Sequence, residues 1–138
     1  MNKIVIAMVA LGTMAFTGSA SAEKLKATLD GKSEVPATTS SGKGTADLDY
    51  DAASKKLSWK LTYSGLSGPA TAAHFHGPAE AGKNAGVMVP IPNAATSPVE
   101  GSATLTDAQA ADLLGGKLYV NIHTAANPGG EIRGQVTK

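Results

Sequence analysis

The sequence contains three histidines, and two of them are spaced so that a strand would present them together. His74 and His76 are separated by a single residue, Phe75, in a short segment that is predicted to be a strand. Side chains two positions apart on a strand point to the same face, with their Cα atoms about 6.5–7 Å apart. We therefore expect both imidazoles to project from one face and Phe75 to enter the core on the other.

The third histidine, His123, ends a second segment of alternating residues. The apolar residues at positions 118, 120 and 122 would face the core, so Tyr119, Asn121 and His123 would face the opposite way. If the two strands are neighbours, all three imidazoles converge on one point. A histidine on a strand can also serve only to hydrogen-bond a nearby carbonyl, so a structural role is the competing interpretation.

Three converging imidazoles are suited to a transition-metal ion. Neutral imidazole is a ligand for copper and zinc, and three such ligands leave a fourth position open. Met88, the one methionine after residue 22, is a candidate for that position, because a thioether favours Cu(I). A methionine between two valines is also typical of a hydrophobic core, which is the stronger expectation for Met88.

Two groups of charged residues allow further interpretations. Glu131 and Arg133 follow a Gly-rich turn with alternate spacing, and a carboxylate there could orient His123. The alternative is a surface ion pair that contributes little. Three alternating carboxylates on another predicted strand could bind calcium, or could simply be solvated at a strand edge: Asp47, Asp49 and Asp51.

Alternation of apolar and polar residues recurs along most of the chain and predicts strands. The clearest segments are 25–29, 46–50, 57–63, 99–105, 118–124 and 132–136. One helix is expected between strands, because Thr106 and Gln109 have the spacing of a capping box and Gly115 follows as a stop. We predict an all-β fold, an antiparallel Greek-key-like β-sandwich or barrel with one short helix.

Composition excludes several classes of function. The chain has 138 residues, which suits one domain, and its 12 basic and 11 acidic residues provide no basic surface for nucleic acid. The absence of cysteine excludes disulfides, zinc fingers and cysteine nucleophiles. Neither a nucleophile elbow nor a phosphate-binding Gly-rich loop is present, so no catalytic residues are assigned.

The first residues resemble a secretory signal peptide. A short cationic start with Lys3 precedes an apolar run over 4–16, and the small residues that follow end at Ala22. The run is about 13 residues long, shorter than the roughly 20 that span a bilayer. We expect residues 1–22 to be a signal peptide and residues 23–138 to form the domain. The mature protein would then be periplasmic or secreted, with no membrane span.

Two stretches resemble the signatures of the CHRD (chordin-type) domain family. The first runs from Ala73 through His74, Phe75 and His76 to Ala79, and the second runs over 118–135 and includes Asn121-Ile122-His123-Thr124. A looser likeness extends over about 24–137. The resemblance implies an all-β domain of exported bacterial proteins and of animal chordin. Chordin's regulation of growth factors belongs to a larger multidomain protein and is not implied here.

The histidines also resemble, more weakly, the copper ligands of Cu,Zn superoxide dismutase. That likeness matches His74, His76 and His123 to copper ligands and Arg133 to an anion-guiding arginine. The chain lacks a bridging histidine, further zinc histidines and the disulfide, which speaks against a zinc site of that type and against dismutase activity.

The sequence therefore favours a non-enzymatic protein that binds a transition metal, with copper preferred and zinc as the alternative. One rival is an interaction or structural module that binds no metal and contacts another extracytoplasmic protein. A second rival is a redox enzyme of the superoxide-dismutase type.

Overall fold

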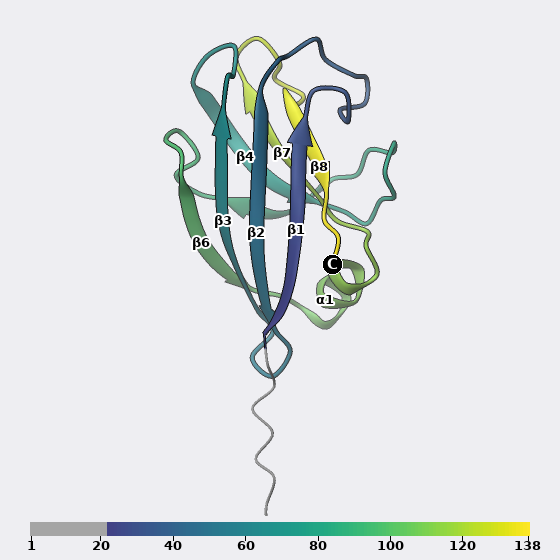
Figure 1. Ribbon diagram of the computed structural model, residues 1–138. Helices are drawn as coiled ribbons and strands as arrows, with labels where there is room; N and C mark the ends of the chain where they lie inside the picture. The colour runs from purple at the N-terminus through teal and green to yellow at the C-terminus, as the bar shows by residue number, and fades with distance from the viewer. Residues whose placement is uncertain (1–21) are drawn as a thin grey trace, which may run out of the picture.

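The computed structural model describes residues 22–138, so nearly all of the expected signal peptide lies outside the described residues. The fold is all-β, with eight antiparallel strands in the order β5-β4-β7-β8-β1-β2-β3-β6. The sheet curls into a nearly closed barrel with one short helix, as predicted (Figure 1). The elements are β1 (Glu23–Asp30), β2 (Lys43–Asp51), β3 (Lys56–Ser64), β4 (Ala70–His76), β5 (Val87–Ile91), β6 (Val99–Thr104), α1 (Asp107–Leu114), β7 (Tyr119–Thr124) and β8 (Ile132–Gln135).

The core lies between a layer made of β1, β2, β3 and β6 and a layer that contains β4, β7 and β8 (Figure 1). Strands β1, β2 and β3 alternate between buried and more exposed residues over most of their length, which is the pattern that predicted them. Across the core, the Trp59 ring on β3 meets Phe75 on β4 edge-to-face, with the centroids 5.3 Å apart. Phe75 has no exposed surface, which confirms that it points inward.

Helix α1 connects β6 to β7 and begins as the capping pattern predicts. The Thr106 side chain accepts from the Gln109 backbone N–H, and the Gln109 side chain accepts from the Thr106 N–H. The helix ends at Gly115, and its buried residues Ala110 and Leu113 pack against the core. No helix within residues 22–138 is long and apolar enough to cross a membrane.

Strand β5 was not predicted, because it is short and Pro90 interrupts its alternation. It lies at one edge of the sheet and pairs only with β4, and proline is tolerated at such an edge. Val89 and Ile91 are buried, whereas Val87 is 56% exposed. Met88 is half-buried and packs against the core, as the stronger of its two sequence interpretations predicts.

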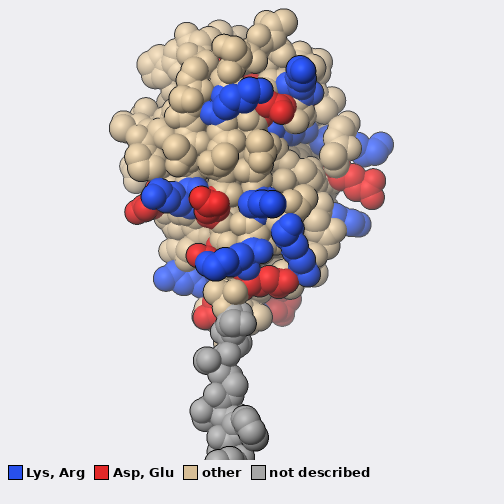
Figure 2. Space-filling model, viewed as in Figure 1, with Lys and Arg blue, Asp and Glu red and all other residues tan. Residues whose placement is uncertain are grey.

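The outer face of the β1–β3 layer carries the alternating carboxylates. Asp47 and Asp49 are exposed on β2, which lies between β1 and β3, so the expectation of a strand edge is wrong. Asp49 pairs with Lys24 at 2.8 Å, and acidic and basic side chains are intermixed over this face (Figure 2). Lysines therefore balance these carboxylates, which leaves no concentrated negative charge to hold calcium.

The buried position of Phe75 generates a test of the two-layer core. Phe75→Ala removes a ring that contacts Trp59 and should lower the free energy of unfolding by about 3–5 kcal/mol, measured by chemical denaturation. Val87→Ala is the control, because the Val87 side chain on β5 is exposed, and it should change the free energy of unfolding by less than about 0.5 kcal/mol. An equal effect of the two substitutions would mean that the assigned strand faces are wrong.

Candidate metal centre

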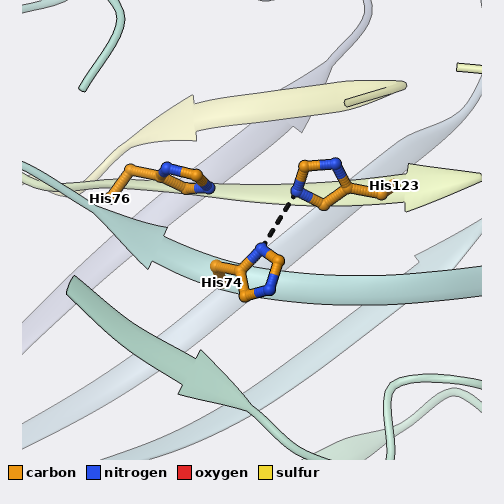
Figure 3. Close-up of side chains that lie close together, drawn as sticks. All are labelled: His74, His76 and His123. Atoms are coloured by element: carbon orange, nitrogen blue, oxygen red, sulfur yellow. Dashed lines mark hydrogen bonds between the residues drawn. The ribbon is translucent and has the colours of Figure 1, made fainter. Parts of the chain in front are cut away.

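The antiparallel pairing of β4 with β7 brings the three histidines together. The register places His74 opposite Asn121 and His76 opposite Tyr119, while His123 lies two residues beyond Asn121 on β7, opposite Ala72. One ring nitrogen from each histidine lies within 4.8 Å of those from the other two. The rings turn toward a common space on the side away from the core (Figure 3). The predicted convergence of the three side chains is confirmed.

Backbone carbonyls orient two of the rings. His76 Nδ1 lies 3.0 Å from the Ala85 carbonyl oxygen, and His123 Nδ1 lies 2.8 Å from that of Pro128. A carbonyl can only accept, so each Nδ1 carries the proton and each Nε2 keeps a free lone pair. Such a hydrogen bond on the far nitrogen is the usual support of a metal-binding histidine.

The third ring closes the cluster through a direct contact. His74 Nδ1 lies 3.1 Å from His123 Nε2, which is an acceptor, so His74 Nδ1 is the donor (Figure 3). For His74 to offer Nδ1 as a ligand, its proton must move to Nε2. His74 is half-buried rather than enclosed, so this change of tautomer does not require the core to open.

Burial favours the neutral form of His74 and His76, which is the form that binds metals. It lowers the pKa of His76, which is only 7% exposed, even though the hydrogen bond to Ala85 opposes the effect. Burial also lowers the pKa of His74, and the neighbouring His123 and His76 lower it further. Both rings are therefore neutral near pH 7, with a lone pair available for coordination.

Tyr119 stacks on the His76 ring, and Arg133 lies over the Tyr119 ring. The rings of His76 and Tyr119 are parallel, with centroids 4.9 Å apart, and the Arg133 guanidinium lies 3.9 Å from the Tyr119 ring centre. The Tyr119 hydroxyl donates to the Ala85 carbonyl and accepts from the Ala85 N–H, both at 3.0 Å. The same peptide group therefore holds both His76 and the ring behind it.

Arg133 forms a buried ion pair with a residue that sequence reasoning missed. Its Nε lies 3.3 Å from the carboxylate of Glu34, and both side chains are almost completely buried. Burial raises the pKa of Glu34 despite the opposing charge of Arg133. Arg133 also donates to the Lys83 carbonyl and the Asn84 side chain. The expectation that Arg133 and Glu131 form a surface ion pair is wrong: the ion pair is buried, and its acid is distant in the sequence.

Glu131 also has a different role from the one expected. It is fully buried, and its carboxylate accepts from Ser67, Ser40 and Thr124, among others. Burial acts to raise its pKa, but the hydrogen bonds outweigh this and lower the pKa to about 2. Glu131 joins three connecting segments, and the Pro128 carbonyl, not this carboxylate, orients His123. The prediction that Glu131 orients His123 is therefore wrong.

The low pKa of Glu131 predicts how stability depends on pH. Its ordinary pKa is 4.5 and its folded value is about 2, so its contribution is complete above the ordinary value and is lost as the pH falls toward 2. Glu131→Gln should cost about 1–3 kcal/mol at pH 7 and flatten this acid dependence, measured by denaturation at each pH. The exposed Glu100→Gln is the control, and an acid profile of Glu131→Gln identical to that of the wild type would contradict the assignment.

Comparison with known proteins identifies the family. No curated protein and no solved structure gives a significant match to this chain. The model of the CHRD domain family matches residues 25–136, nearly all of the described chain and all three histidines. The chain therefore belongs to the CHRD domain family.

Proposed function

We propose that this protein is an exported CHRD-domain protein that binds one transition-metal ion through His74, His76 and His123 and serves in metal binding or handling. Copper is the preferred metal, because imidazole is among its favoured ligands and divalent copper binds nitrogen sites more tightly than zinc does. The observation that carries the proposal is the convergence of all three histidines with two Nδ1 atoms bound to carbonyls.

The unpaired nitrogen of His76 favours a metal over a purely structural role. Its Nε2 is buried and has no hydrogen-bond partner among residues 22–138. Buried polar atoms are nearly always paired, and leaving one unpaired costs about 1–3 kcal/mol. A histidine that only supported the fold would be expected to use both nitrogens. Coordination would give this atom a partner, and His74 and His123, which already contact each other, would bind the same ion.

The proposed set of ligands does not include Met88. It packs against the hydrophobic core, and its terminal methyl lies 3.2 Å from where a Cβ on Gly77 would stand. Three imidazoles without a thioether or thiolate form a set of neutral nitrogen ligands, which suits copper and zinc and discriminates against calcium and magnesium.

Export is proposed from the first 22 residues. Strand β1 begins at Glu23, so cleavage after Ala22 would leave every strand of the fold intact.

Substitution of each histidine tests the metal site. His74→Ala and His123→Ala should each weaken copper binding by a similar factor, at least about tenfold, and the triple His→Ala variant should bind no copper. Titration of the metal-free protein with Cu(II), Cu(I) and Zn(II) gives stoichiometry and affinity, with one equivalent expected for the wild type.

A variant with both Asp47→Asn and Asp49→Asn is the matched control, because it removes two exposed carboxylates outside the histidine cluster. Its copper binding should equal that of the wild type. Full affinity in His123→Ala would show that the cross-strand convergence does not form the site. A wild-type protein that binds none of these metals would leave the histidines with structural roles.

The export proposal has a separate test. Intact mass and N-terminal sequencing of the protein from an extracytoplasmic fraction should show a chain that begins at Glu23. A cytoplasmic protein that retains Met1 or Asn2 would contradict export without affecting the metal site.

A further inference from the structure

Asn121 lies in the middle of the histidine face and is almost completely buried, with 1% of its surface exposed. It is directly opposite His74 on β4 and opposite Arg133 on β8, and it is two residues before His123 on β7. Neighbouring residues in such a register share one face of the sheet. The Asn121 amide is therefore surrounded by the histidines on one side and by the Arg133–Glu34 pair on the other.

The atoms without partners gather at this position. Four buried side-chain atoms among residues 22–138 have no hydrogen-bond partner, and three of them belong to Glu34, His76 and Asn121. On His76 the atom is Nε2, which carries a lone pair because Nδ1 holds the proton. On Asn121 it is the carbonyl oxygen Oδ1, which can only accept. Two buried acceptors without a donor create a site that a cation would satisfy.

Gly130 and Glu34 determine which way the Asn121 amide faces. A Cβ on Gly130 would lie 2.6 Å from Glu34 Oε1 and 2.7 Å from Asn121 Nδ2, so only glycine lets these two groups pack together here. The NH₂ group of Asn121 lies beside the Glu34 carboxylate and acts to lower its pKa, against the effect of burial. The amide oxygen then turns away from Glu34. Asn121 also lies close enough to His76 to influence its pKa.

We propose that Asn121 Oδ1 is the fourth ligand of the metal, completing a site of three imidazole nitrogens and one carboxamide oxygen. This inference rests on the proposed three-histidine site and specifies its oxidation state. A carboxamide oxygen is a harder ligand than a thioether, so it favours a divalent ion, Cu(II) or Zn(II), over Cu(I). The Glu34–Arg133 pair acts as a positioning group that holds the amide in the required orientation.

Replacement of the amide separates the two oxidation states of copper. Asn121→Leu keeps the branched shape and removes the oxygen, so it should lower the affinity for Cu(II) and Zn(II) at least about tenfold and change Cu(I) affinity only a few fold. The mature protein is titrated with each ion under matched conditions. An equal loss for Cu(I) and Cu(II), or no loss, would overturn the assignment of Asn121 as a ligand.

Tyr119→Phe is the matched control. It removes the hydroxyl that bonds to Ala85 and so loosens the support of His76 without removing a proposed ligand. We expect it to affect both oxidation states alike, which distinguishes loss of support from loss of a ligand. A wild-type protein that binds no metal would refute the proposed function itself, whereas unchanged selectivity in Asn121→Leu with loss of binding in the histidine variants would refute only the role of Asn121.

A measurement on the wild type avoids reliance on a variant that could fold poorly. Zn(II) is diamagnetic, so NMR can follow the side-chain carbonyl carbon of Asn121 during a zinc titration. Coordination through Oδ1 should shift this resonance in step with the imidazole nitrogens of His74, His76 and His123, with saturation at one equivalent. An Asn121 resonance that stays in place while the histidine signals move would overturn the proposal.

Discussion

The pairing of β4 with β7 is the interaction on which the centre depends. Antiparallel register places His74 opposite Asn121 and His76 opposite Tyr119, and a slip of one residue would turn the polar side chains of one of the two strands into the core. The register is held from the other side of the sheet, because Phe75 and Val120 face each other across these strands and have no exposed surface. Burial of the apolar side chains thus fixes the register, and the register decides which polar side chains lie together on the other face.

The loops between the strands orient the histidine rings that the strands position. The carbonyls that orient His76 and His123 belong to Ala85 and Pro128, which lie in loops rather than strands. Arg133 anchors the first loop through Lys83 and Asn84, and Glu131 anchors the second through Thr124 and Asn127. Buried charges are costly unless they are well paired. Burial raises the pKa of Glu34 despite its pairing with Arg133, whereas the hydrogen bonds of Glu131 more than offset its burial.

Alternation was sufficient to predict most of the strands and the face on which the histidines lie, because burial on one side of a sheet leaves a period of two. It did not predict β5, where Pro90 interrupts the pattern. The start of the helix could also be predicted, because Thr106 and Gln109, which form its capping box, are close together in the sequence. Glu34 could not be found in this way: its partner, Arg133, is 99 residues away. The role of Glu131 was misjudged for the same reason, since Ser40 and Ser67 reach it only in the folded chain.

The metal content of the protein as isolated shows whether the three histidines bind a metal. The mature protein should be purified without chelators from an extracytoplasmic fraction, beside the triple His→Ala variant, and analysed for copper and zinc. We expect about one equivalent of tightly held metal, copper in preference to zinc, in the wild type and none in the variant. The same metal content in both proteins, or none in the wild type even after loading, would contradict this expectation.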